Sequence, residues 1–189
     1  MRKLILSEFL TLDGVMEAPG GEPTHPHSGW VFDFMGPEQE RYKLEETLAA
    51  EALLLGRVTY EGFAAAWPAR SGQFADKMNS MPKFVASTTL VELAWNNAEL
   101  LEGDVAESVR ALKDQDGGPI LVAGSRTLAQ ALVAHGLIDE YRLMVFPVVL
   151  GSGMRLFADD NPDKMVLELV DTLTFGSGVV VHTYRPPGD

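Results

Sequence analysis

Residues 118–157 constrain the fold more than any other part of this sequence. An apolar run at residues 120–123 leads directly into the turn-forming residues Gly124-Ser125-Arg126-Thr127, and a helical pattern of apolar residues follows up to Gly136. A second apolar run then occupies residues 141–149. The segment therefore predicts a strand, a tight turn, a helix and a second strand.

The turn of this unit is a candidate anion site. The first N–H groups of a helix have no partners within the helix, and the aligned peptide dipoles favour negative charge there. A phosphate-bearing ligand would bind at such a helix N-terminus. The alternative is that Ser125 or Thr127 only caps the helix, and the segment alone does not separate the two interpretations.

The same alternation of strands and helices continues along most of the chain. Strands are predicted at residues 3–10, 52–55 and 83–86, and helices at residues 37–50, 56–67 and 104–113. A long loop at residues 11–36 is rich in Gly, Pro and His, and residues 164–184 indicate a β-hairpin that turns near Gly176-Ser177-Gly178. This pattern predicts a single α/β domain over residues 1–189, with three layers (α/β/α), a mostly parallel mixed sheet and an antiparallel C-terminal hairpin.

Composition excludes several classes of function. The net charge of −12 argues against nonspecific binding to nucleic acid or to anionic membranes, because both need a cationic surface. The chain has no cysteine, so it can form no disulfide, thiolate nucleophile or cysteine-based metal site. The first residues, MRKLILSEFLTLDG, lack the uninterrupted apolar run of a signal peptide, and we expect a cytoplasmic protein. A small phosphorylated ligand is still allowed, because it needs only local donors.

Three predicted strand ends carry small, hydroxylated or cationic residues. They are Gly56-Arg57-Val58-Thr59, Ser87-Thr88-Thr89 and Gly124-Ser125-Arg126-Thr127. The carboxyl ends of parallel strands share one edge of a sheet, and ligands bind there. Three such turns together indicate an extended phosphorylated ligand such as a dinucleotide. The G-x-G-x-x-G fingerprint is absent, so a dinucleotide site here would not be of the usual fingerprint type.

Six segments carry a resemblance to a known family, and they follow one another over nearly the whole chain. They are Thr11-Leu12-Asp13-Gly14, Gly56-Arg57-Val58-Thr59-Tyr60-Glu61, Val85-Ala86-Ser87-Thr88, Ile120-Leu121-Val122-Ala123-Gly124-Ser125, Gly136-Leu137-Ile138-Asp139-Glu140-Tyr141 and Pro147-Val148-Val149-Leu150-Gly151-Ser152-Gly153-Met154-Arg155-Leu156-Phe157. In this order they resemble the dihydrofolate reductase-like superfamily, specifically the proteins similar to the reductase domain of riboflavin biosynthesis (the RibD C-terminal domain). The resemblance implies a dihydrofolate reductase-like fold, NADPH bound across the sheet edge, and hydride transfer to a C=N or C=O carbon.

The resemblance also implies roles for individual residues. The cofactor-binding residues would be Gly14, Gly56, Arg57, Thr59, Ser87, Thr88, Gly124, Ser125, Arg126 and Thr127. The turn at Gly56 would hold phosphate, Ser87 and Thr88 would lie near the adenosine ribose and its 2′-phosphate, and the turn at Gly124 would cradle the pyrophosphate. Asp13 is the catalytic candidate, and with Gly14 it would border the nicotinamide and the substrate.

The substrate side is expected to involve Asp13, Trp30 and Phe34. The rings of Trp30, Phe32 and Phe34 could stack a flat heterocycle, or they could fold the loop onto the core or onto a partner subunit. Folate reductases bind the pterin through a carboxylate on the helix after the first loop, and Asp33 and Glu38 are the candidates here. The two histidines of His25-Pro26-His27 have no dependable third ligand nearby, so no metal site is predicted.

The sequence therefore predicts an NADPH-dependent reductase of a small heterocyclic substrate, ribosylaminopyrimidine-like or pterin-like. A 5-amino-6-(5-phosphoribosylamino)uracil reductase-type activity is one candidate reaction, and by resemblance the protein would be a homodimer. Two alternatives stay open. The chain could be a non-catalytic module that binds a nucleotide or heterocycle on the same fold, or its turns could be only helix caps while its apolar loop serves oligomer assembly.

Overall fold

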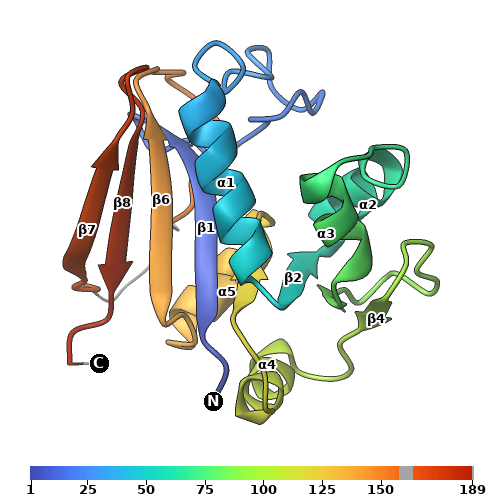
Figure 1. Cartoon of the computed structure of the whole chain (residues 1–189). Coiled ribbons are helices and arrows are strands. Elements are labelled where there is room, and N and C mark those ends of the chain that lie inside the picture. Colours follow the sequence, from blue (N-terminus) through green and yellow to red (C-terminus); the bar gives the residue numbers. More distant parts are fainter. Residues whose placement is uncertain (158–163, 189) are drawn as a thin grey trace.

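The computed structural model of the chain describes residues 1–157 and 164–188 (Figure 1). In chain order its elements are β1 (Leu4–Thr11), α1 (Pro37–Ala49), β2 (Ala52–Gly56), α2 (Arg57–Ala66), α3 (Gln73–Ser80), β3 (Lys83–Ala86), β4 (Ala98–Leu100), α4 (Val105–Asp114), β5 (Ile120–Val122), α5 (Arg126–Ala134), β6 (Glu140–Phe146), β7 (Glu168–Thr174) and β8 (Val180–Arg185). None of the helices in these two ranges is long and apolar enough to cross a lipid bilayer.

These strands form one mixed sheet with the order β4-β3-β2-β5-β1-β6-β8-β7. Neighbouring strands from β4 to β6 are parallel, whereas β8 is antiparallel to both β6 and β7. The chain moves outward from β1 through β2 and β3 to β4 and then returns, so that β5 lies between β2 and β1. The predicted mostly parallel sheet with an antiparallel C-terminal hairpin is confirmed.

Helices cover both faces of this sheet and complete the three layers (Figure 1). Successive residues of a strand point to opposite faces, and the core clusters separate accordingly. Leu4 and Leu6 of β1 pack in one cluster with buried residues of α4 and α5, whereas Ile5 packs with buried residues of α2 and α3. Ser7, which shares the face of Ile5, donates a hydrogen bond to Glu46 of α1. Thus α1, α2 and α3 cover one face, and α4 and α5 cover the other.

Local chemistry sets the ends of several helices as the sequence predicts. Pro37 begins α1, and Asp104 caps α4 by accepting hydrogen bonds from the N–H groups of Ala106 and Glu107 at 3.0 Å each. Gly136 follows α5 with a φ of +60°, a backbone conformation that glycine adopts without strain.

Three elements differ from the prediction. β6 ends at Phe146 and not at residue 149, because Pro147 has no N–H to continue a strand ladder. α3 and β4 were not predicted. α3 has eight residues and β4 only three, so neither is long enough to show a clear periodic pattern, and β4 exists by pairing with β3.

Candidate cofactor and substrate site

The three predicted turns and the Thr11-Leu12-Asp13-Gly14 segment follow four neighbouring strands of the sheet. In sheet order these strands end at Ala86 (β3), Gly56 (β2), Val122 (β5) and Thr11 (β1). Because the four strands are parallel, the turns that follow them lie at one edge of the sheet. The predicted convergence of the turns is therefore confirmed. We call these four strand ends and the turns that follow them the rim.

Two of the turns on the rim are in direct contact. Ser125 Oγ donates a hydrogen bond to Thr59 Oγ1 at 2.8 Å. A Cβ atom added to Gly56 would lie 2.4 Å from Ser125 Oγ, and one added to Gly124 would lie 2.9 Å from Thr59 Oγ1. Gly124 also has a φ of +83°, which a side chain would strain. Both glycines are thus needed for the N-termini of α2 and α5 to approach so closely.

Neither of these two helix N-termini has a side-chain cap. In contrast, α4 has the carboxylate of Asp104 in that position. The first N–H groups of α2 and α5 therefore keep donor capacity, and the positive ends of two helix dipoles meet at one place. Such an arrangement favours an anionic ligand, and a phosphate group fits it in both charge and hydrogen bonding.

The two arginines predicted at the rim differ in their availability. Arg57 pairs with Glu61 at 3.1 Å, but both side chains are nearly half exposed, and such surface pairs contribute only about 0–1 kcal/mol. Arg57 can therefore turn toward a phosphate at little cost. Arg126 donates from Nε to the carbonyl of Arg155 at 3.2 Å, which ties the start of α5 to the segment after β6.

The turn after β3 offers further hydroxyl groups. Ser87 Oγ accepts hydrogen bonds from the N–H groups of Thr89 and Leu90 at 3.1 and 3.0 Å, so it orders the turn while its own hydroxyl can still donate. Thr88 in this turn and Thr127 at the start of α5 are exposed. All the predicted cofactor residues therefore lie on the rim, and their binding role stays a prediction.

Asp13 joins two loops at the end of β1. Its carboxylate accepts hydrogen bonds from the hydroxyl of Thr11 at 2.6 Å and from the N–H groups of Gly151 and Leu150 at 2.8 and 3.3 Å. The Thr11 hydroxyl above all, together with these N–H groups, lowers the pKa of Asp13, so it has no proton to donate at neutral pH. Gly14 follows with a φ of +80°. The geometry supports a positioning role for Asp13, and its assignment as the catalytic residue stays a prediction.

The aromatic loop folds mainly onto the core. Trp30 is 4% exposed, its Nε1 donates to the carbonyl of Glu17 at 2.8 Å, and its ring meets Phe146 edge to face at 5.3 Å. Phe34 is half-buried and packs against the same ring at 6.1 Å. These contacts favour the loop-packing alternative for Trp30 and Phe34, whose substrate role stays a prediction. Phe32, by contrast, is 64% exposed.

The two carboxylates considered for pterin binding are both exposed. Glu38, in the first turn of α1, accepts a hydrogen bond from the N–H of Gly176 at 2.9 Å and so ties α1 to the C-terminal hairpin. Asp33 lies in the aromatic loop before α1. The buried carboxylate of α1 is instead Glu46, which accepts a hydrogen bond from Ser7 at 2.8 Å.

A buried carboxyl group that was not predicted lies directly behind the Gly124 turn. Glu8 of β1 is 6% exposed, and its Oε1 accepts the N–H of Gly124 at 2.9 Å. Burial raises the pKa of Glu8 to about 8, although the Gly124 hydrogen bond and the charge of Lys43 oppose the shift. Glu8 is therefore mostly protonated at neutral pH. One signal in the sequence was available, because Glu8 is the single charged residue of an otherwise apolar and hydroxylated strand.

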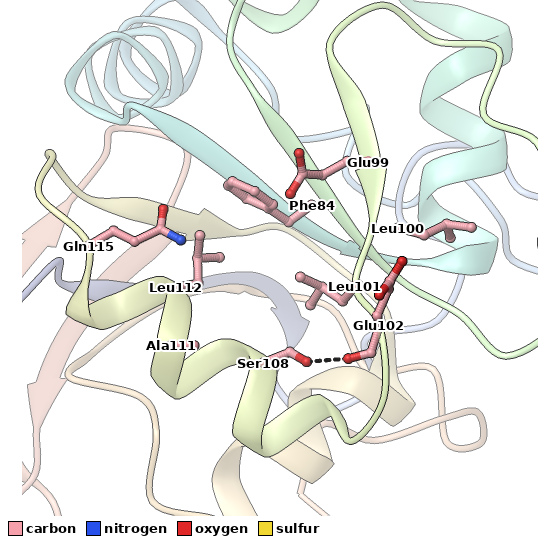
Figure 2. Close-up of a pocket in the computed structure, with 9 residues that line it drawn as sticks. All are labelled: Phe84, Glu99, Leu100, Leu101, Glu102, Ser108, Ala111, Leu112 and Gln115. Atoms are coloured by element: carbon pink, nitrogen blue, oxygen red, sulfur yellow. Dashed lines mark hydrogen bonds between the residues drawn. The ribbon is translucent and has the colours of Figure 1, made fainter.

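A cavity of about 590 Å³ lies between α4 and the β3–β4 edge of the sheet (Figure 2). Phe84, Leu101 and Leu112 are among the apolar side chains that line it, and the carboxylates of Glu99 and Glu102 lie at its margin. Leu101 and Glu102 directly follow β4, so one end of the cavity lies at the same edge of the sheet as the rim. Its lining mixes apolar with polar side chains, and its carboxylates disfavour a phosphate.

The sequence profile of the RibD C-terminal domain matches residues 2–181. The chain belongs to the RibD C-terminal domain family. A relative of this RibD C-terminal domain is the uncharacterized protein YyaP of Bacillus subtilis (strain 168), which is 31% identical over 97% of this chain and 95% of YyaP.

Solved structures show which fold this RibD C-terminal domain has. A putative riboflavin biosynthesis protein from Shewanella sp. PV-4 superposes with a TM-score of 0.73 at 20% identity and covers 97% of this chain and 98% of its own. Dihydrofolate reductase from Enterococcus faecalis, complexed with NADP(H), has a TM-score of 0.63 at 16% identity, with 98% and 96% of the two chains covered. The predicted dihydrofolate reductase-like fold is thus confirmed.

Proposed function

We propose that this RibD C-terminal domain is an NADPH-dependent reductase that acts on a small heterocyclic substrate. The observation that carries the proposal is the meeting of two uncapped helix N-termini, those of α2 and α5, on the rim. Membership of the RibD C-terminal domain family supports a reductase-type role. The cofactor assignment is further supported by the dihydrofolate reductase of the same fold, which was solved with NADP(H).

The residues of the rim fit a phosphorylated dinucleotide. Gly56 and Gly124 let the starts of α2 and α5 approach each other closely, and Thr59 and Ser125 supply hydroxyl groups beside the free N–H groups of the two helices. We assign the pyrophosphate to this place. NADPH, when bound, supplies the hydride.

The adenosine end of the cofactor would lie toward β3. Arg57 and the hydroxyls of Ser87 and Thr88 follow the adjacent strands β2 and β3, and together they offer a cation and donors for a 2′-phosphate. The cavity between α4 and the β3–β4 edge would take the adenine ring against the apolar side chains of Phe84 and Leu112 (Figure 2). Arg126 and Thr127 would complete the pyrophosphate site from the first turn of α5.

The substrate would lie at the β1 side of the rim. The Asp13 carboxylate bonds to the N–H of Gly151 and so holds the loop after β1 against that residue. Gly14 has a positive φ and lets the chain turn directly after Asp13. We propose that this pair shapes the opening beside the nicotinamide. A ribosylaminopyrimidine is the substrate class to test first, because the family is named for the riboflavin pathway protein RibD, and pterins come second.

A charge placed at the pyrophosphate site tests the proposal. In Ser125→Asp the new carboxylate would lie at the start of α5, where it would repel a phosphate. We expect calorimetric titration to show NADPH binding to the wild type and strongly reduced binding to Ser125→Asp. The matched control is Ser71→Asp, which adds the same charge at an exposed position before α3 and should leave the affinity unchanged.

NADPH oxidation would then be followed across ribosylaminopyrimidines and pterins. Turnover of any of these substrates supports the reductase. Binding without oxidation of NADPH favours the non-catalytic module. Absence of NADPH binding to the wild type contradicts the proposed function.

We also propose a homodimer that uses the C-terminal hairpin. Every residue of the edge strand β7 is exposed. Several of the exposed side chains in and before this strand are large and apolar, namely Met165, Val166, Leu169, Val170 and Leu173. An exposed apolar edge strand is a surface that a partner chain commonly covers. Light scattering should show a dimer for the wild type and a monomer for Leu169→Lys. A monomeric wild type would contradict the proposal.

A further inference from the structure

The buried carboxyl group of Glu8 belongs to the same turn as the proposed pyrophosphate site. The pairing of β1 with β5 ends at Leu6 and Val122, and Glu8 and Gly124 each lie two residues further along. Glu8 Oε1 accepts the Gly124 N–H at 2.9 Å. This bond means that the Gly124 N–H faces the protein interior, so the donors left for a ligand are those of the first turn of α5. Glu8 thus fixes the turn from behind.

The second carboxyl oxygen of Glu8 lacks a hydrogen-bond donor among the described residues. Among those residues, Ser28 Oγ is the only side-chain polar atom that is both fully buried and without a partner. Glu8 Oε2 also lacks a partner, so it is not fully buried and keeps some contact with solvent. The other oxygen of the same carboxyl group bonds to the Gly124 turn, so this free oxygen lies beside that part of the rim.

The charges around Glu8 do not outweigh the cost of burying an ionised form of this group. The charged groups that act on it are Lys43 and Glu46 of α1, and their effects have opposite signs. Lys43 itself bonds to Glu46 and Ser7, so its charge is already shared. An ionised Glu8 would therefore set a buried negative charge beside a site proposed to bind a polyanion.

We propose that Glu8 carries a proton when the cofactor binds, so that NADPH affinity is coupled to protonation of this buried carboxyl group. In the neutral form one oxygen still accepts the Gly124 N–H, and the hydroxyl can donate to a phosphate oxygen. Loss of the proton removes this hydroxyl donor and leaves a negative charge on Glu8, which repels the phosphate. The inference rests on the proposed function, and it assigns Glu8 as a positioning residue of the cofactor site.

Calorimetric titration of NADPH as a function of pH tests this coupling. Burial raises the pKa of Glu8 to about 8. The 2′-phosphate of NADPH has a second pKa of about 6 and is mostly ionised by about pH 7, so the useful window runs from about pH 7 to about pH 9.5. We expect the Kd of the wild type to rise by up to about tenfold per pH unit above pH 8. Titrations in buffers of different ionisation enthalpy should show uptake of protons by the complex near pH 8.

Two variants isolate Glu8 from other groups that titrate in this window. Glu8→Gln keeps an oxygen for the Gly124 N–H and should bind NADPH with an affinity that changes little from about pH 7 to about pH 9.5. Glu22→Gln removes an exposed charge and should keep the wild-type slope. Burial also lowers the pKa of Lys83 to about 8, but Lys83 lies at the opposite end of β3 and is unchanged in both variants.

The outcomes separate the inference from the proposed function. The coupling would be overturned if the Kd for NADPH did not depend on pH. It would also be overturned if the Kd changed with pH as steeply in Glu8→Gln as in the wild type. Either result would leave the proposed reductase function intact. Absence of NADPH binding at every pH would overturn both. If Glu8→Gln fails to fold, the proton uptake of the wild type decides, and an uptake of zero near pH 8 overturns the inference.

Discussion

The contact between the N-termini of α2 and α5 predicts a large effect of Gly56→Ala. The added methyl group would lie 2.4 Å from Ser125 Oγ and 2.5 Å from Ser125 Cβ, well inside van der Waals contact. Gly56 has a φ of −84°, which alanine adopts freely, so the effect comes only from this overlap. To relieve it, the start of α5 must move by about 1 Å, and overpacking of this kind costs about 1–3 kcal/mol.

The displaced helix start should also lose the cofactor. A shift of about 1 Å in a set of binding groups can lower function by about 100-fold, so we expect NADPH to bind Gly56→Ala roughly 100-fold more weakly. The matched control is Gly62→Ala in the same helix, because a Cβ at Gly62 would meet nothing within 4 Å. This exposed substitution should raise stability by about 0.5–1 kcal/mol and leave the affinity unchanged.

A double mutant shows whether Ser125 is the cause. Ser125 has a φ of +70°, so glycine fits its backbone, and Ser125→Gly removes both atoms that the new methyl group would meet. Gly56→Ala should therefore destabilise the Ser125→Gly protein much less than the wild type, as measured by urea denaturation. Unchanged stability of Gly56→Ala would refute the tight packing of the two helix starts. Lost stability with unchanged NADPH affinity would refute the cofactor assignment.

Three further predictions concern other residues of the site. The pKa of Glu8, about 8 when folded and 4.5 ordinarily, means that the folded chain binds a proton that the unfolded chain lacks between these values. The free energy of unfolding should thus fall by up to about 5 kcal/mol as pH rises from 4.5 to 8. Urea denaturation of Glu8→Gln should show a much smaller fall over this range. An equal fall in the variant would contradict the assignment. Arg57→Gln should bring the NADPH and NADH affinities close together, because it removes the cation proposed to bind the 2′-phosphate. Arg110→Gln, on the exposed side of α4, should leave the preference for NADPH unchanged. An unchanged preference in Arg57→Gln would mean that the 2′-phosphate binds elsewhere. Asp13→Asn should lower the melting temperature because it weakens the bond to Gly151, and NADPH should still bind; an unchanged melting temperature would mean that the contact is not stabilising.

Much of the fold could be predicted because its signals are local. Asp104 caps α4, Gly136 ends α5 and the glycines near Ser177 turn the hairpin, and in each case the residue acts on its own segment. The convergence of the turns on the rim followed from the alternation of strands and helices, since parallel strands share their carboxyl edge. The short elements α3 and β4 were missed because their formation depends on packing against neighbours.

The missing parts of the site depend on contacts between distant segments. The contact of Glu8 with Gly124 arises from the register of β1 beside β5, which no local pattern reveals. Two of the three bonds that occupy Asp13 come from residues 150 and 151, far along the chain. Likewise, the ring of Trp30 is buried against Phe146 of β6, a contact that decides between packing and ligand stacking.

The central claim is that the first turns of α2 and α5 jointly hold the phosphates of NADPH. Hydrogen exchange measured by mass spectrometry, with and without saturating NADPH, tests it most directly. We predict slower exchange of backbone amides at the start of α2, at the start of α5 and in the turn after β3. Saturating binding of NADPH with protection elsewhere, and with no change at these two helix starts, would contradict the claim.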